Sequence, residues 1–158
     1  MGQHHDYASQ LLASQDFFAR STRVLEEVDS GFRPKNETMT VAQQVAHAAQ
    51  TLDCFVQGAT RAEGFDLDFE THAKEVAAVT SLASARKWLD EAYGRAVGFL
   101  RAASAEDMAR LLPEGPVMGG QPVSDVVFAM IEHTAHHRGA LTVYSRLLGK
   151  VPVMPYFG

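Results

Sequence analysis

The chain has 158 residues, which is enough for one domain with a hydrophobic core and too few for two. Apolar residues make up 46% of it and charged residues 21%, a balance that is typical of globular proteins and argues against intrinsic disorder. The net charge of −5 and the lack of a basic cluster argue against a nucleic acid partner.

The sequence also bears on the compartment. No apolar run reaches the roughly 18 residues that a membrane span needs, and the first residues lack the pattern of a signal peptide. The single cysteine, Cys54, excludes an internal disulfide and fits a reducing environment. We therefore expect one soluble domain over residues 1–158, located in the cytoplasm and without a membrane partner.

Helical spacing of apolar residues predicts two helices in the first part of the chain. The first runs over residues 7–29, and Ser30 and Gly31 end it. The segment Thr40–Gln43 has the form of a capping box, in which a hydroxyl residue is followed three positions later by a glutamine. It predicts the start of a second helix over residues 40–63.

The second part of the chain predicts two more helices and two long connections. Residues 65–80 mix aromatic and acidic side chains, which indicates a connection with at most a short helical piece. A third helix is predicted over residues 82–103, and prolines and glycines make residues 104–121 an irregular connection. Pro122 suits the first turn of a fourth helix over residues 122–148, and an apolar tail fills residues 149–158. No segment has the alternation of a β-strand, so we expect an all-α four-helix bundle whose order is not simply up-down-up-down.

The fourth predicted helix carries two histidines in register. His133 and His137 are four residues apart, so their side chains stack on one face of the helix. At about 100° per residue they fall on the same stripe as Met130 and Tyr144, which we expect to face the core. Buried imidazoles need partners, and one metal ion shared by both side chains would supply them.

A third metal ligand has to come from another part of the chain. Four histidines are poorly placed for this role: His4, His5, His72 and His136. The first two lie in a polar lead-in, the third lies in the uncertain connection, and the fourth points about 80° away from the stripe centre. His47 in the second helix remains. It lies on a flank of that helix with small or polar neighbours: Gln44, Thr51 and Cys54.

Three neutral imidazoles around a divalent ion leave coordination positions open for water or substrate, as in catalytic zinc sites. The ligand type alone is compatible with zinc, nickel, iron or manganese. The sequence therefore predicts a metal-dependent enzyme that acts on a small-molecule substrate. We expect three further side chains to support the ligands: Gln44, Thr51 and Tyr144.

Several alternatives remain open at this point. One alternative is a bundle that binds a metal or a ligand without turnover, such as a stress-response sensor or carrier. In another, the histidines are ordinary core residues satisfied by a backbone carbonyl or by Tyr144, and the protein is an interaction module. Cys54 can be a soft ligand, a nucleophile or a small core residue. Glu132 lies about 120° from the stripe centre, so we expect it in solvent. The chain lacks the Glu-x-x-His pairs of di-iron bundles and the His-Glu-x-x-His sequence of zinc proteases.

The segments TVAQQVAH (residues 40–47) and HTAHHRG (residues 133–139) together resemble the DinB family of metal-binding helical bundles. That family includes transferases that depend on the low-molecular-weight thiols bacillithiol or mycothiol. The resemblance implies an up-down-down-up bundle, a nickel or zinc ion on His47, His133 and His137, and a homodimer. Ala140 departs from the family, since many members carry glutamine there, and this puts one supporting hydrogen bond in doubt. The family's chemistry varies, so the resemblance implies the fold and the metal more firmly than the reaction.

Overall fold

The computed structural model describes residues 6–157, and this part of the chain contains helices and one isolated β-bridge but no strand. The four long helices are α1 (Tyr7–Thr22), α2 (Val41–Thr60), α4 (Leu82–Ala102) and α6 (Asp125–Leu147). The connections hold a 3-10 turn η1 (Glu27–Asp29) and the short helices α3 (Phe69–Ala77) and α5 (Ala105–Ala109). Among the described residues no helix has both the length and the apolarity to cross a membrane. The predictions for His4 and His5 lie outside the described range.

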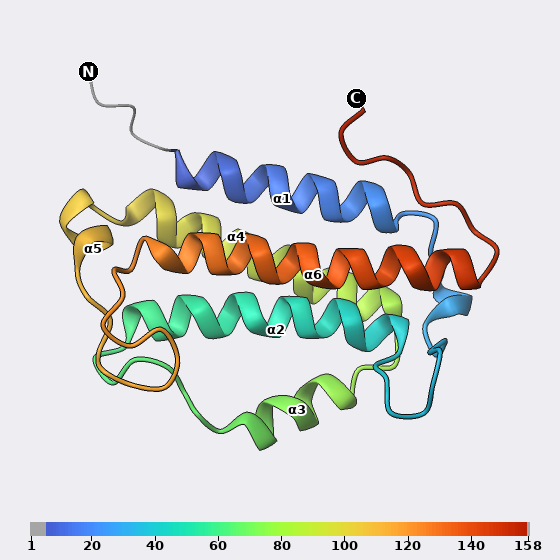
Figure 1. Ribbon diagram of the computed structural model, residues 1–158, viewed down its shortest axis with the longest axis horizontal. Helices are drawn as coiled ribbons and strands as arrows, with labels where there is room; N and C mark the ends of the chain where they lie inside the picture. Colours follow the sequence, from blue (N-terminus) through green and yellow to red (C-terminus); the bar gives the residue numbers. More distant parts are fainter. Residues whose placement is uncertain (1–5, 158) are drawn as a thin grey trace.

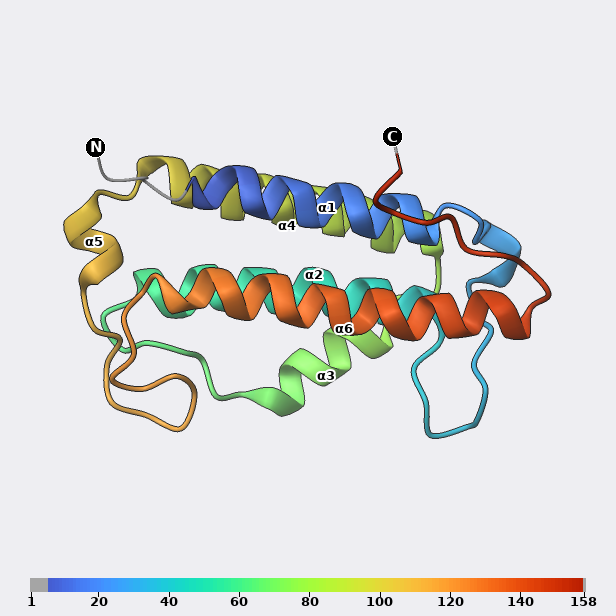
Figure 2. The same ribbon diagram turned by 45° about the horizontal axis from the view of Figure 1, so that its top comes forward.

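The four long helices form a bundle with the predicted up-down-down-up order. Figure 1 shows α1 and α6 running in one direction and α2 and α4 running in the other. Each helix packs on two others, since α1 and α2 both contact α4 and α6. In Figure 2 these contacts appear as two layers, α1 with α4 and α2 with α6. Because α2 and α4 run parallel, the chain between them has to return along the bundle, and α3 lies on this return path.

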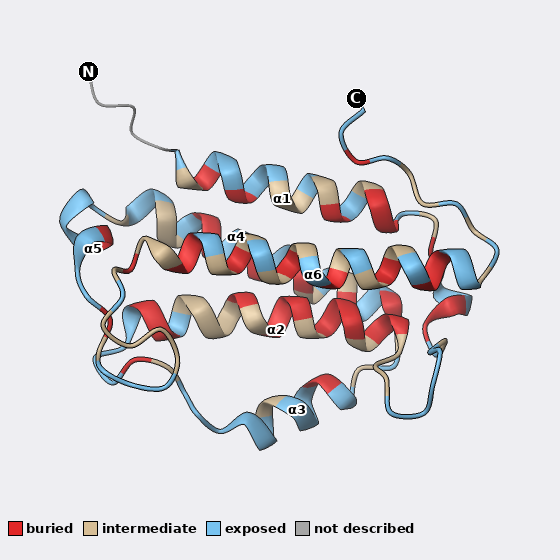
Figure 3. Ribbon diagram, viewed as in Figure 1, coloured by how far each residue is buried: buried red, intermediate tan, exposed pale blue. Residues whose placement is uncertain are grey.

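Small side chains allow the central helices to pack closely. Alanines fill many buried positions of α2 and α4: Ala42, Ala46, Ala49, Ala59, Ala85, Ala92 and Ala96. Larger fully buried side chains such as Leu52, Tyr93 and Met130 fill the rest of the core, and Figure 3 shows the buried positions facing inward on all four long helices. The helix α2 is therefore packed tightly between its neighbours, which holds its side chains in a defined position against α6.

The first helix is shorter than predicted, because α1 ends at Thr22 and not near residue 29. Arg86 of α4 donates hydrogen bonds to the carbonyl oxygens of Thr22 (2.9 Å) and Leu25 (3.0 Å). These carbonyls would otherwise accept from the backbone of a continuing helix. Leu25 still turns into the core, which explains why the apolar spacing continues beyond the helix.

The start of α6 also differs from the prediction, because the helix begins at Asp125 and not at Pro122. The backbone before it pairs with the preceding connection: the Val123 N–H donates to the Arg110 carbonyl (2.9 Å) and the Ser124 N–H to the Met108 carbonyl (2.9 Å). Pro122 therefore lies in the isolated bridge and not in the first helical turn.

The return path from α2 to α4 contains the short helical piece expected in residues 65–80, as helix α3. Asp68 caps α3 by accepting a hydrogen bond from the Thr71 N–H (3.1 Å). At the other end of α3, Gln43 donates to the Ala77 carbonyl (3.2 Å) while also completing the predicted capping box with Thr40. This bond fixes α3 along one side of α2.

Candidate metal centre

Two neighbouring helices bring three imidazoles together. His47 comes from α2, and His133 and His137 come from α6. One ligand nitrogen from each ring can be chosen so that all three lie within 4.8 Å of one another. The ring centroids are 4.6 to 5.1 Å apart. The structure thus brings together the three histidines that the sequence predicted. His133 and His137 lie one turn apart on α6, and His47 lies opposite them on α2.

A chain of hydrogen bonds fixes the proton on His137. The Tyr144 hydroxyl donates to the Met39 carbonyl (2.9 Å), so it accepts from the Gln44 amide nitrogen (3.3 Å). This turns the Gln44 oxygen toward Nδ1 of His137, 2.5 Å away, and Nδ1 must then carry the proton. The Nε2 lone pair of His137 is left facing the cluster, as in histidines that bind metals.

The environment keeps these imidazoles uncharged. Burial, together with the neighbouring histidines, lowers the pKa of His137 to about 3 and that of His133 to about 4. Burial also lowers the pKa of His47, with a smaller contribution from His136. Burial removes water from around the charged imidazolium and so destabilises it, and the cluster contains no acidic side chain that would stabilise it. At neutral pH all three rings therefore offer lone pairs.

The three imidazoles are suitable donors for a divalent ion, and the two on α6 also have the spacing that one ion requires. Nε2 of His133 lies 3.0 Å from Nε2 of His137. Two nitrogens that bind one ion at about 2.0–2.1 Å cannot be more than about 4.2 Å apart, so this pair fits without rearrangement. Imidazole nitrogen suits zinc, nickel, copper and iron, and a set without carboxylates suits magnesium or calcium poorly.

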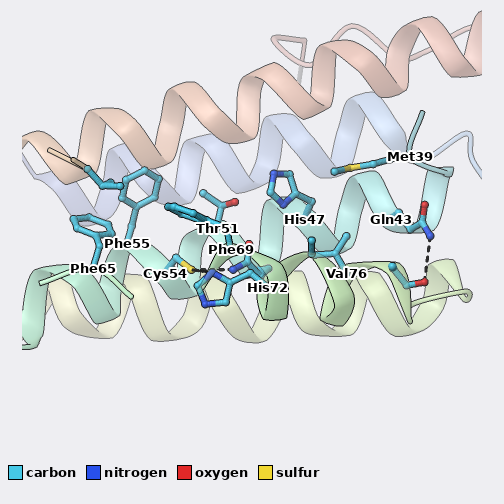
Figure 4. Close-up of a pocket in the computed structure, with 14 residues that line it drawn as sticks. Met39, Gln43, His47, Thr51, Cys54, Phe55, Phe65, Phe69, His72 and Val76 are labelled. Carbon is cyan, nitrogen blue, oxygen red and sulfur yellow. Dashed lines mark hydrogen bonds between the residues drawn. The ribbon is translucent and has the colours of Figure 1, made fainter. Parts of the chain in front are cut away.

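A cavity of about 390 Å³ adjoins the cluster, and His47 lies in its wall (Figure 4). Its other walls come from α2, α3 and the connection between them, and they are mainly apolar, with Phe55, Phe65 and Phe69 among them. This volume is in the range of small-molecule sites. Since His47 belongs to both the cluster and the cavity wall, a molecule in the cavity lies next to the His47 imidazole.

The other residues that the sequence analysis singled out lie in different parts of the site. Gln44 and Tyr144 belong to the hydrogen-bond chain that ends on His137, whereas Thr51 lines the cavity. His136 is exposed at the edge of the cluster, with its ring centroid 5.1 Å from that of His137. Glu132 is exposed, as predicted.

The sequence does not predict the second histidine of the cavity, His72, because its segment shows no clear helical spacing. In the structure His72 lines the cavity from α3 and faces Cys54. The sequence signal for this helix is Asp68, a residue type that often caps helix N-termini. Its side chain accepts from the Thr71 N–H, so α3 starts there and His72 lies in its first turn.

Solved structures with the same fold have low sequence identity to this chain. YfiT from Bacillus subtilis, described as a "probable metal-dependent hydrolase with an unusual four-helix bundle topology", superposes with a TM-score of 0.73 at 16% identity, covering 95% of this chain and 91% of YfiT. The DinB-like protein YjoA from B. subtilis gives 0.64 at 17% identity, covering 93% and 94%. A mycothiol-dependent maleylpyruvate isomerase gives 0.72 at 16% identity, covering 89% of this chain but only 63% of the isomerase.

At such identities the structural matches establish a shared fold and not a shared reaction. No curated protein has a significant sequence match to the chain. The sequence model of the DinB superfamily, however, matches residues 10–141, a range that contains α2, α3, α4 and α5, most of α1 and α6, and all three histidines of the cluster. The chain therefore belongs to the DinB superfamily.

Proposed function

We propose that the protein is a metal-dependent enzyme in which His47, His133 and His137 hold a divalent ion, and that the reaction takes place on a small electrophile in the adjoining cavity. The observation that carries this proposal is the cluster of three neutral imidazoles, one of which, His47, lies in the wall of a cavity. A closed structural site would have no such access.

The residues of the chain have distinct tasks in this proposal. Gln44 holds the proton on Nδ1 of His137, which keeps Nε2 available as a ligand. A divalent ion on the three imidazoles would lower the pKa of water or of a thiol toward neutrality and so supply the nucleophile. The aromatic walls of the cavity would contact the apolar part of a bound electrophile and hold it beside His47.

We propose nickel or zinc as the metal, with iron and manganese as the alternatives, on the basis of the imidazole donors. A low-molecular-weight thiol is proposed as the second reactant in the case of transfer, and water in the case of hydrolysis. The fold shared with a mycothiol-dependent isomerase supports the thiol, and the fold shared with YfiT supports hydrolysis. A cytoplasmic location and a homodimer are also proposed, and light scattering after size-exclusion chromatography tests the dimer.

The alternative function is a bundle that binds a metal or a ligand without turnover. One observation favours it: within residues 6–157 the metal-binding group consists of histidines alone, without a carboxylate that could act as a general base. Saturable turnover of thiol and electrophile would favour the enzyme, whereas ligand binding without product would favour the carrier.

Measuring the metal content tests whether the three histidines bind an ion, which the enzyme and a metal carrier both require. Protein purified without a histidine tag should contain close to one equivalent of nickel or zinc by elemental analysis. The variant His47→Ala should lose most of it, because two ligands hold an ion much less tightly than three. His136→Ala is the matched control, since it removes an exposed imidazole beside the cluster and should leave the metal in place. Equal metal in the His47→Ala variant and the native protein would contradict the assignment.

A further inference from the structure

A second group of reactive side chains lies in the same cavity. Cys54 on α2 faces His72 on α3, with Sγ 3.7 Å from Nδ1 (Figure 4). The other ring nitrogen of His72, Nε2, lies 3.6 Å from a carboxylate oxygen of Asp66, in the connection before α3. A thiol, an imidazole and a carboxylate thus follow one another in the order found in nucleophilic sites.

The polar contacts around this group suit transfer of the thiol proton. The Asp66 carboxylate favours the form of His72 that carries its proton on Nε2, which leaves the Nδ1 lone pair facing the Cys54 S–H. The amide nitrogen of Gln50 donates to the sulfur at 2.8 Å. A donor in this position stabilises the negative charge that develops on sulfur when the proton leaves.

The cavity supplies a binding place for the molecule that would react. Cys54 is partly exposed in the cavity wall, and Phe55, Phe65 and Phe69 lie in the same wall. The rings of Phe55 and Phe65 meet edge to face, with centroids 5.7 Å apart. Such a lining binds flat apolar groups, since aromatic pairs gain free energy beyond the burial of area.

We propose that Cys54 is a nucleophilic site, with His72 as its base, for small aromatic electrophiles bound in this cavity, and that the reaction needs no metal. In the step, the Cys54 proton moves to Nδ1 of His72 while the sulfur forms a bond to the electrophilic carbon. With an iodoacetamide the carbon–iodine bond breaks and iodide leaves with the bonding electrons. The products are a thioether on Cys54, iodide and a protonated His72, which then returns its proton to water.

The site needs a base because its thiol is not acidic. Burial raises the pKa of Cys54, and the carboxylates of Asp66, Asp53 and Glu75 raise it further, against the opposing effect of the Gln50 donor. At neutral pH the sulfur is therefore protonated, and attack has to remove the proton as the new bond forms. His72 is in position to accept it.

The experiment uses two probes with the same reactive group, N-benzyl-iodoacetamide and iodoacetamide, on chelator-treated protein. Cys54 is the only cysteine, so mass spectrometry of the peptide that contains it reports its alkylation separately from that of histidines and lysines. At pH 7.0 the rate with the benzyl probe should saturate with probe concentration, and the rate with iodoacetamide should not. The variant His72→Gln should slow the benzyl reaction by at least about tenfold. Glu70→Gln, an exposed change on the same helix, is the matched control and should leave the rate unchanged.

A parallel measurement at pH 10 separates proton transfer from a change of structure. There the thiol ionises increasingly on its own, so the difference between native protein and His72→Gln should shrink to about twofold or less. An equal slowing at both pH values would overturn the role of His72 as a base, and unchanged alkylation at pH 7.0 would do the same. A rate that rises linearly with the benzyl probe would overturn binding in the cavity. None of these outcomes depends on the metal, so they are independent of the metal test above.

Discussion

At the scale of single residues, the cluster depends on one amide. Gln44 is buried, and its two ends are satisfied by different partners, Tyr144 on one side and His137 on the other. Because the Tyr144 hydroxyl already donates to the Met39 carbonyl, the amide has only one orientation that satisfies all the groups. The tautomer of His137 is therefore decided by a backbone carbonyl more than ninety residues away in the sequence.

The variant Gln44→Leu tests this chain. Leucine has a similar size but accepts no hydrogen bond, so Nδ1 of His137 loses its partner and the tautomer is no longer fixed. We expect metal affinity to fall by about 10- to 100-fold, measured by competition with a chromophoric chelator. Thr51→Val is the control, since Thr51 lines the cavity but has no part in the chain. If Gln44→Leu binds metal within twofold of the native protein, the chain does not support the site.

The histidines also predict how the metal-free protein responds to acid. In the folded state the pKa of His133 is lowered to about 4 and that of His137 to about 3, against about 6.5 in the unfolded chain. Between pH 6.5 and about 4 the unfolded chain therefore binds protons that the folded chain does not. Stability must fall as the pH falls through this window, and above pH 6.5 these groups contribute nothing.

We expect a loss of roughly 1–3 kcal/mol in the free energy of unfolding between pH 6.5 and pH 4.5, discounted for the partial exposure of the rings. Urea denaturation of chelator-treated protein measures it. The double variant His133→Asn/His137→Asn should flatten the dependence in this window, and His136→Asn should not. A native profile that coincides with that of the double variant would contradict the argument.

At the scale of elements, the sequence predicted the long helices better than their ends. The four long helices and the shared face of His133 and His137 follow from apolar periodicity, which records what faces the core. The up-down-down-up order is implied by the resemblance to the DinB family, and His47 is selected by elimination among the remaining histidines. The end of α1 could not be predicted, because Arg86 on α4 donates hydrogen bonds to the carbonyls of Thr22 and Leu25 at that end. The start of α6 depends likewise on backbone pairing with residues 108 and 110. Such ends are decided by tertiary contacts that leave no local signal.

One glycine on α2 shapes the cavity wall. A Cβ at Gly58 would lie 2.5 Å from the nearest ring carbon of Phe65, so this ring rests directly on the helix backbone. Gly58→Ala should therefore displace Phe65 and lower the free energy of unfolding by about 1–2 kcal/mol, despite alanine's higher helix propensity. Gly94→Ala on α4 is the matched control, because nothing lies within 4 Å of its Cβ, and it should stabilise by up to about 1 kcal/mol. Chemical denaturation measures both, and equal stabilisation by the two changes would contradict the close contact.

At the scale of the whole molecule, the cluster joins two of the four long helices. α2 precedes the return path through α3, and α6 is the last helix of the bundle. An ion held by His47 and by the α6 pair would therefore link the middle of the chain to its end. The unfolded chain cannot offer the three rings in this arrangement, so binding must favour the folded state.

Thermal unfolding should consequently depend on the metal. At a free ion concentration of about 100 times the dissociation constant, binding adds about 2.7 kcal/mol to the free energy of unfolding. For a domain of this size that corresponds to a rise in Tm of roughly 5–11 °C when nickel or zinc is added to chelator-treated protein. His133→Ala should abolish the rise while His136→Ala retains it, because only the first removes a ring of the three-histidine group. An equal rise in His133→Ala would mean that the ion binds elsewhere, and no rise in the native protein would leave the three imidazoles as a neutral part of the core.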